Sequence, residues 1–140
     1  MKNTLTIYCD GGARGNPGPA AAAFVVLLNG KIIYKNAFYL GKSTNNVAEY
    51  NAVILALKWI LKISNIKYQV SSITFVLDSE LIAKQITGVY KTKNNNLIKL
   101  LSKVRFLQEK IKKNINYLHV AREKNRLADF LVNQKLDSIA

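Results

Sequence analysis

The sequence predicts an α/β fold, in which a five-stranded mixed sheet follows the element order β-β-β-α-β-α-α-β-α and carries helices on both faces. The first three segments are strand-like and closely spaced, which is typical of an antiparallel meander. From residue 46 onward, apolar residues recur at helical spacing, and two short strand-like runs interrupt them. Because crossovers between parallel strands are right-handed, we expect these two later strands beside the first strand and parallel to it.

The three N-terminal strands are expected at residues 4–8, 20–28 and 31–40. Asn29 and Gly30 separate the second strand from the third, and an Asn-Gly pair is a strong signal for a hairpin turn. The first strand is followed by an acid, Asp10, and then by a glycine-rich loop. Glycine has no Cβ atom, so such a loop lets the backbone approach a ligand closely.

The second half of the chain alternates helices with the two later strands. Gly88 is expected to close the second helix, and a basic, amide-rich loop at 90–96 precedes the third. The third helix is amphipathic, with lysines opposite its apolar positions. The expected elements are a helix at 46–63, a strand at 73–77, a helix at 79–86, a helix at 97–111, a strand at 116–120 and a helix at 126–136.

The composition predicts a single domain, residues 1–140, with an anionic partner. The chain has 140 residues, of which 49% are hydrophobic, enough to build a core. It contains 21 Lys and Arg against 8 Asp and Glu, a net charge of +13. This charge favours nucleic acid as partner, because phosphate contacts release counterions. A basic surface that only keeps the protein soluble is the alternative interpretation.

The single cysteine, Cys9, has no partner for an internal disulfide, which indicates a reducing compartment. The N-terminus enters a strand pattern directly, without the apolar core of a signal peptide. No run reaches the ~18 apolar residues of a membrane span. We therefore expect a cytoplasmic protein that does not contact membranes. Cys9 itself is expected to be a small apolar strand residue rather than a nucleophile.

Four of the acids lie where chemistry is expected, and each also has a simpler interpretation. Asp10 suits a turn that bonds its own backbone. Glu49 suits a capping box begun by Asn46. Asp78 suits the N-cap of the helix that follows it. Asp129 suits the first turn of the last helix, where negative charge favours the helix dipole.

Taken together, the four simpler interpretations weaken. Asp10 and Asp78 follow strands expected to be parallel neighbours, and sites form beyond such strand ends. Glu49 and Asp129 lie near helix starts that can face the same edge. Four convergent carboxylates raise one another's pKa unless cations lie between them. Carboxylate ligands suit Mg²⁺ or Mn²⁺, and two such ions ~3.5–4 Å apart suit hydrolysis of a phosphodiester.

Four segments of the chain carry a family resemblance: DGGARGNPGP at 10–19, STNNVAEY at 43–50, LDS at 77–79 and REKNRLAD at 122–129. In this order they resemble the motifs of type 1 ribonuclease H, the ribonuclease HI family. The resemblance implies the ribonuclease H-like fold. It also implies hydrolysis of the RNA strand of RNA–DNA hybrids with two Mg²⁺ or Mn²⁺ ions, leaving 5′-phosphate and 3′-hydroxyl ends. The catalytic and metal-binding acids it assigns are Asp10, Glu49, Asp78 and Asp129.

The resemblance also implies contacts with the hybrid. Asn16, Asn45 and Asn46 match positions that contact the minor groove, where 2′-hydroxyl groups distinguish RNA from DNA. Thr44, with Lys42 nearby and Asn16 opposite, matches a pocket for a phosphate of the DNA strand. The other substrate-binding residues that it implies are Gly11, Gly12, Ala13, Arg14 and Asn125.

The chain departs from the family pattern before the last acid. Many members carry a histidine in that loop, whereas this chain resembles a branch with an Arg-Glu-x-Asn sequence there. Arg122 is expected to be catalytic, steadying the scissile phosphate or the leaving oxyanion as a permanent cation. The single histidine, His119, is expected to be packed in the last strand. Trp59 fits the buried face of the first helix.

The chain also lacks the basic protrusion with which longer members grip the hybrid. Lys91, Lys93 and the lysines of residues 97–113 are expected either to replace part of that grip or to form a solvated helix face. Weaker binding and a steep salt dependence would follow. We expect a monomer that needs no protein partner, and double-stranded RNA is a further candidate substrate in this family.

Two other functions compete with the nuclease at this point. One is a catalytically silent module that binds hybrids or double strands, and an intact set of acids argues against it. The other is a DNA-directed nuclease of related fold, such as a junction resolvase or an integrase. The glycine-rich loop together with Thr44, Asn45 and Asn46 argues against the second.

Overall fold

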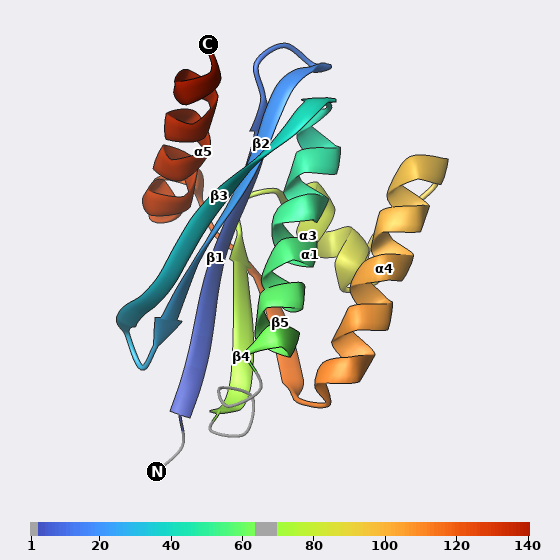
Figure 1. The fold of residues 1–140 in the computed structure, drawn as a ribbon. Helices are drawn as coiled ribbons and strands as arrows, with labels where there is room; N and C mark the ends of the chain where they lie inside the picture. The colour runs from blue at the N-terminus through green and yellow to red at the C-terminus, as the bar shows by residue number, and fades with distance from the viewer. Residues whose placement is uncertain (1–2, 64–69) are drawn as a thin grey trace.

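The computed structural model describes residues 3–63 and 70–140. Its strands are β1 (Asn3–Ala13), β2 (Gly18–Leu28), β3 (Lys31–Ser43), β4 (Val70–Leu77) and β5 (Asn114–His119). They form one mixed sheet in the spatial order β3-β2-β1-β4-β5 (Figure 1). Neighbours among the first three strands are antiparallel, whereas β4 pairs parallel with β1 and β5 pairs parallel with β4. This topology confirms the predicted fold class.

Helices cover both faces of the sheet (Figure 1). The larger core lies between the sheet and three helices, α1 (Asn45–Lys62), α3 (Glu80–Ile86) and α4 (Asn95–Ile111). A smaller core lies on the other face, under α5 (Arg126–Ile139), which follows the 3₁₀ turn η1 (Arg122–Lys124). None of the helices in the described parts of the chain is both long enough and apolar enough to cross a membrane.

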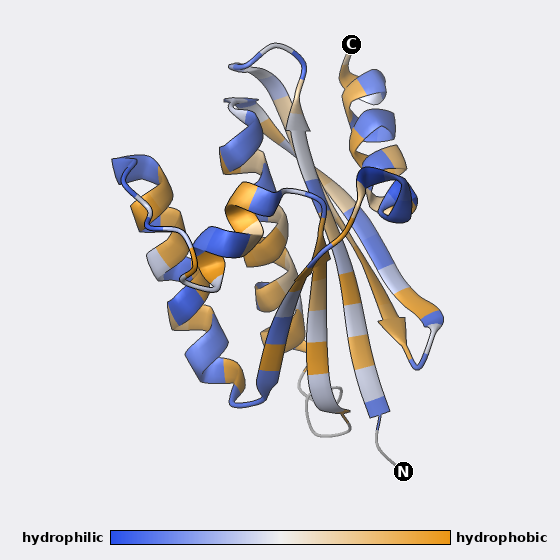
Figure 2. Cartoon of the chain, turned by 180° about the vertical axis from the view of Figure 1, so that it is seen from behind, coloured by the Kyte–Doolittle hydropathy of each residue, from blue (hydrophilic) through white to orange (hydrophobic). Residues whose placement is uncertain are grey.

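β1 supplies side chains to both cores because successive strand residues point to opposite faces. Leu5, Ile7 and Cys9 are buried in the larger core, whereas Tyr8 packs against the smaller one. The hydropathy of β1 alternates accordingly along the strand that begins near the N-terminus (Figure 2). Burial raises the pKa of the Cys9 thiol well above its usual value, which suppresses the thiolate that a nucleophile needs. The expectation that Cys9 is a packed apolar residue is therefore confirmed.

α1 lies directly against β1 at Gly11. A Cβ atom at Gly11 would collide with the backbone carbonyl group of Ala48, so glycine is what allows this close approach. Ala48, Ala52 and Ala56 recur every four residues and are fully buried, so they form a seam of small side chains on the helix. The contact brings the next residue of α1, Glu49, to the edge of β1.

The predicted hairpin turn is confirmed at Asn29 and Gly30, whose φ angles are 51° and 84°. The side-chain oxygen of Asn29 accepts a hydrogen bond from the backbone N–H of Thr4 at 3.0 Å. The turn is therefore tied to the start of β1 as well as to the strands that it joins.

The bounds of β1 differ from the predicted ones in a way that matters for the site. The strand continues to Ala13, which still pairs with Ala20 of β2. Asp10 consequently lies inside a strand, not at its end, and the irregular loop is reduced to residues 14–17. What ends at Cys9 is the parallel pairing with β4, in which Cys9 faces Leu77.

The predictions for Trp59 and His119 have different outcomes. Trp59 packs against the larger core as predicted, with its ring stacked on Tyr34 at a centroid distance of 5.0 Å. The prediction that His119 is packed is wrong. This histidine is exposed, because it is the last residue of β5 and β5 is an edge strand of the sheet.

Candidate active site

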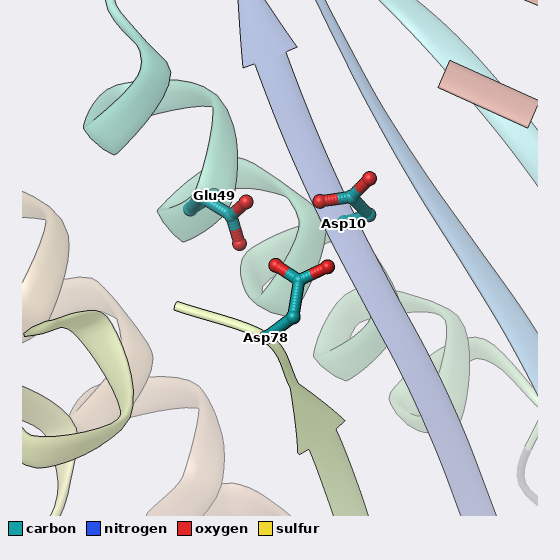
Figure 3. Close-up of side chains that lie close together, drawn as sticks. All are labelled: Asp10, Glu49 and Asp78. Carbon is teal, nitrogen blue, oxygen red and sulfur yellow. The ribbon is translucent and has the colours of Figure 1, made fainter. Parts of the chain in front are cut away.

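Three carboxylates converge where the parallel pairing of β1 and β4 ends (Figure 3). Asp10 comes from β1, Glu49 from α1 and Asp78 from the position directly after β4. Each offers a carboxylate oxygen, and these oxygens all lie within 4.8 Å of one another. Because Cys9 pairs with Leu77, the residues that follow them, Asp10 and Asp78, lie side by side.

Glu49 is positioned by the contact between α1 and β1 rather than by a capping interaction. Thr44 is the N-cap of α1, and its hydroxyl oxygen accepts a hydrogen bond from the N–H of Val47 at 3.2 Å. The alternative that Glu49 forms a capping box with Asn46 is therefore wrong. Glu49 is only 7% exposed and accepts a hydrogen bond from the N–H of Gly11 at 3.3 Å.

Asp78 is not a helix cap either. Ser79 is the N-cap of α3, and its hydroxyl oxygen accepts a hydrogen bond from the N–H of Ile82 at 3.2 Å. The Asp78 carboxylate instead accepts a hydrogen bond from the Asn125 side-chain amide at 3.3 Å. The same amide donates to the Cys9 carbonyl at 2.7 Å. Asn125 therefore links β1 at Cys9 to Asp78, the residue that follows β4, under the acids.

Asp129 lines the same pocket from the first turn of α5, but it does not belong to the cluster of three. Its Oδ1 accepts a hydrogen bond from Nη2 of Arg122 at 3.4 Å. The Arg122 side chain is 79% exposed, so it can turn toward a bound molecule.

The pocket has a volume of about 350 Å³, and its lining includes Asp10, Gly12, Asn45, Glu49, Asp78, Arg122, Asp129 and Asn133.

Burial makes these carboxyl groups weaker acids than usual. Burial, with the negative charges of Asp78 and Asp129, raises the pKa of Asp10 to about 7. Burial, followed by the charge of Asp10, raises the pKa of Glu49 well above its usual value, and burial also raises the pKa of Asp78. The Asp129 carboxylate raises the pKa of Arg122, which therefore stays charged. Full ionisation of the cluster is thus costly unless positive charge is bound within it.

The donor set fits a hard divalent cation. Glu49 Oε2 is buried and has no hydrogen-bond partner among the described residues. An unpaired buried oxygen of this kind is costly, and a bound cation would satisfy it. The cluster found in the described parts of the chain consists of carboxylates alone, which suit Mg²⁺ or Mn²⁺ rather than Zn²⁺. Asp10, Glu49 and Asp78 therefore form a candidate metal centre, with Asp129 beside it.

Two asparagines brace the glycine-rich segment next to the acids. Asn45 Oδ1 accepts a hydrogen bond from the N–H of Ala13 at 2.8 Å, and Asn16 Oδ1 accepts one from the N–H of Asn45 at 3.0 Å. Both side-chain oxygens are engaged, whereas neither Nδ2 group donates a hydrogen bond within the described parts of the chain. An amide whose oxygen is engaged offers N–H donors to a ligand. The site thus presents donors from Asn16 and Asn45.

Gly11 and Gly12, both implied as substrate contacts, differ in their surroundings. Gly11 is packed against the backbone of α1. A Cβ atom at Gly12 would meet only ordinary contacts, the nearest with Val132 Cγ1 at 3.7 Å. The fold therefore has room for a larger residue at position 12.

The other implied substrate contacts have varied positions. Lys42 is exposed at the end of β3, while Thr44 and Asn46 are half-buried at the start of α1. Asn125 is 1% exposed, beneath the acids. Arg14 forms an ion pair with Asp137 of α5 at 2.6 Å.

Two residues of α5 that were not predicted from the sequence matter here: Asn133 lines the site, and Asp137 pairs with Arg14. Asn133 lines the pocket, and its backbone carbonyl accepts a hydrogen bond from Nη2 of Arg14 at 3.3 Å. Asp137 pairs with the same guanidinium. Asp129, Asn133 and Asp137 recur every four residues, so they share one face of the helix. This spacing is the signal in the sequence that could have found them.

Comparison with known proteins gives consistent matches. Residues 8–135 match the family described as reverse transcriptase-like. The bifunctional protein Rv2228c of Mycobacterium tuberculosis (strain ATCC 25618 / H37Rv) is 35% identical over 138 residues, which are 97% of this chain and 36% of that protein. Ribonuclease H of Wigglesworthia glossinidia brevipalpis is 34% identical over 145 residues, covering 94% of this chain and 87% of that protein. The chain therefore spans about a third of the first relative and most of the second.

Solved structures agree with these matches. LC11-RNase H1, isolated from compost, superimposes with a TM-score of 0.92 at 39% identity, and the match covers 97% of each chain. The structure of LC11-RNase H1 in complex with an RNA/DNA hybrid gives a TM-score of 0.90 at 40% identity, covering 96% of this chain and 98% of that one. On the sheet topology, the acid cluster and these likenesses, the chain belongs to the ribonuclease H-like family.

Proposed function

We propose that this chain is an endoribonuclease that hydrolyses the RNA strand of RNA–DNA hybrids and leaves 5′-phosphate and 3′-hydroxyl ends. One observation supports this most strongly: three carboxylates, one with a buried and unpaired oxygen among the described residues, converge beside amide donors suited to sugar hydroxyl groups. The ribonuclease H among its relatives and the relative solved with an RNA/DNA hybrid support the same reaction and substrate.

We assign two Mg²⁺ or Mn²⁺ ions to the site, held by Asp10, Glu49, Asp78 and Asp129. Bound there, the ions would lower the pKa of an attacking water and stabilise the charge on the leaving 3′-oxygen. The protein's own part is to hold the carboxylates in place before the substrate arrives. The Gly11 N–H holds Glu49 and the Asn125 amide holds Asp78, so little reorganisation is needed.

Recognition of RNA is assigned to the amide donors. The Nδ2 groups of Asn16 and Asn45 would donate to 2′-hydroxyl oxygens or to acceptors in the minor groove, together with Asn46. Gly12, and Ala13 next to it, would let the sugar edge approach the strand backbone. A DNA strand has no 2′-hydroxyl group to accept these bonds, so the RNA strand is the one placed against the acids.

The start of α1 is assigned to a phosphate of the DNA strand. Thr44 Oγ1 accepts a hydrogen bond from Val47, which leaves its O–H able to donate to a phosphate oxygen. The exposed Lys42 adds positive charge near it, and the N-terminus of a helix favours anions.

Arg122 and Arg14 are given supporting roles. Arg122 would leave its pairing with Asp129 to steady the scissile phosphate or the leaving oxyanion. Arg14, joined to Asp137 and Asn133, would hold the loop at 14–17 against α5 in a position to meet the substrate.

Asn125 is assigned to positioning Asp78, because its burial keeps it away from the hybrid.

We further propose a cytoplasmic monomer that needs no protein partner and tolerates double-stranded RNA as a weaker substrate.

The proposal is tested by incubating the purified protein with a labelled hybrid, double-stranded DNA, double-stranded RNA and single-stranded RNA, with Mg²⁺ or with EDTA. We expect cleavage of the RNA strand of the hybrid that depends on the metal. Asp10→Asn should abolish cleavage and retain hybrid binding, whereas Glu109→Gln, which removes an exposed acid of α4, should retain both.

The competing functions give different results in the same assay. Binding of the hybrid without any cleavage by the unaltered protein would indicate a silent module. Preferential cutting of double-stranded DNA would indicate a DNA-directed nuclease. Cleavage by Asp10→Asn at the unaltered rate would show that the metal centre takes no part in the reaction.

A further inference from the structure

The exposed side of α4 carries a stripe of lysines. Lys99, Lys103, Phe106 and Lys110 lie at intervals of four, three and four residues, so they share one face of the helix. All four are exposed, and Phe106 is exposed by 58%. Lys110 Nζ lies 4.4 Å from the centre of the Phe106 ring. The stripe therefore combines positive charge with an accessible aromatic face.

A second stripe faces it from α1. Lys58 and Lys62 lie one turn apart on the exposed side of α1, and α1 packs beside α4 on the same face of the sheet (Figure 1). Contact with the Lys103 amine, together with burial, lowers the pKa of Lys58, so the two stripes meet at this pair. We give the name lysine groove to the exposed side chains of Lys58, Lys62, Lys99, Lys103, Phe106 and Lys110 alone, without reference to a hollow between the helices.

Within the described parts of the chain, no carboxylate neutralises the lysine groove. The ion pairs found there are Arg14–Asp137, Lys84–Glu80 and Arg122–Asp129, none of which includes a groove lysine. The sequence gives the reason. α1 has one acid, Glu49, which is in the active site, and α4 has one acid, Glu109. Glu109 is separated from Lys103 and Lys110 by six residues and one residue, spacings that turn it away from their face.

Adjacent ammonium groups without a counter-ion repel one another, and a bound polyanion relieves this repulsion. Packed helix axes lie about 8–10 Å apart, so a single phosphodiester backbone lying along α1 and α4 can reach both stripes. An unpaired strand can also bring a base into contact with this surface, whereas the bases of a duplex are paired and stacked inside it. An aromatic ring exposed among lysines is also the surface on which an unpaired base stacks.

We propose that the lysine groove binds single-stranded nucleic acid, with its phosphates on the lysines and a base stacked on Phe106. The site is separate from the acid cluster, because Lys58 lies nine residues after Glu49, about 14 Å farther along α1. Binding in the groove does not depend on cleavage, so it stands or falls separately from the proposed nuclease activity.

The test is fluorescence anisotropy with a labelled oligothymidylate of about 15 nucleotides, in EDTA and over a range of salt concentrations. Lys58→Gln with Lys103→Gln should weaken binding and reduce the slope of log affinity against log salt by about 1.4, two contacts at about 0.7 each. The matched control is Lys31→Gln with Lys35→Gln, which removes the same charge from exposed positions on β3. This control variant should leave the slope of log affinity against log salt unchanged.

The aromatic contribution has its own matched pair. Phe106 on α4 and Phe130 on α5 are exposed by 58% and 57%, so truncation to alanine removes a similar share of accessible aromatic surface from each. Phe106→Ala should weaken binding of the oligonucleotide by at least about fivefold, the lower limit for one stacked base. Phe130→Ala should leave it unchanged. Circular dichroism of each variant verifies that the fold is retained.

Three results would overturn the proposal. Equal losses of affinity in the two lysine double variants would mean that the strand is attracted by the net charge of the protein and not by the lysine groove. Equal losses of affinity in the two phenylalanine variants would show that no base stacks on Phe106. A larger effect of the groove variants on a hairpin duplex than on the oligothymidylate would assign the surface to double strands. An inactive nuclease would leave all of these outcomes interpretable, because the binding assay contains no divalent metal.

Discussion

The backbone N–H of Gly11 donates to Glu49 Oε1 at 3.3 Å, and a Cβ atom at Gly11 would lie only 2.2 Å from the carbonyl carbon of Ala48. One residue thus joins the strand that carries Asp10 to the helix that carries Glu49. The two acids are set in relation to each other by a contact of backbones, with no flexible side chain between them.

Gly11 and Gly12 should respond differently to alanine. Gly11→Ala forces apart the backbones of β1 and α1 and should cost about 3 kcal/mol or more in the free energy of unfolding. Gly12→Ala meets only ordinary contacts and should change stability by less than about 1 kcal/mol. If the backbone at Gly12 approaches the hybrid, Gly12→Ala should nonetheless raise KM for cleavage. Urea denaturation measures the effect on stability, and steady-state kinetics measures the effect on KM. An unchanged KM in Gly12→Ala would show that the backbone at Gly12 does not contact the hybrid.

Asn45→Asp separates the structural role of Asn45 from its role in binding. The aspartate keeps an oxygen for the N–H of Ala13 and places negative charge at the helix N-terminus, so the fold should be retained. It lacks the N–H donors and adds charge near the substrate phosphates. We expect hybrid affinity to fall by roughly tenfold or more, as for loss of a hydrogen bond to a site that needs it. Asn114→Asp, at an exposed position of β5, controls for the added charge.

The stability of the metal-free protein should fall as pH rises. The pKa of Asp10 is about 7 in the folded protein but about 3.9 in an unfolded chain. Between these values the folded state holds the proton more tightly, so the free energy of unfolding decreases from about pH 4 to about pH 7. In EDTA, the protein should be less stable at pH 8 than at pH 5, by on the order of a few kcal/mol.

Urea denaturation at the two pH values, with EDTA or with Mg²⁺, measures this effect. Mg²⁺ should raise stability at pH 8 and have less effect at pH 5, because a cation competes with protons for the same oxygens. Asp10→Asn should flatten the pH dependence. A metal-free protein that grows more stable from pH 5 to pH 8 would contradict the assigned acidity of Asp10.

Asn125 should act on the acid cluster without touching substrate. Asn125→Ala removes the hydrogen bonds to the Cys9 carbonyl and to Asp78 in a buried place, at a cost of roughly 1–3 kcal/mol in stability. It should lower kcat and raise the Mg²⁺ concentration needed for half-maximal activity, with little change in hybrid affinity measured in EDTA. Loss of hybrid affinity with an unchanged Mg²⁺ requirement would show instead that Asn125 contacts the substrate.

Local patterns in the sequence determined most of the fold. Strand alternation, helical periodicity and the Asn29-Gly30 turn depend on neighbours within a few residues, and they correctly predicted the order of the elements and the mixed sheet. The expected parallel pairing of β1 and β4 also brought Asp10 and Asp78 together, although Asp10 lies within β1 and not after it, and the motif at 43–50 added Glu49.

Tertiary structure decided which group satisfies each backbone donor and which side chains meet. Thr44 and Ser79, not Asn46 and Asp78, cap their helices, which leaves the acids to face one another. The bond from Gly11 to Glu49 spans 38 residues and that from Asn125 to Asp78 spans 47. Such pairings depend on how elements far apart in the chain pack together, which a pattern confined to a few neighbouring residues cannot encode.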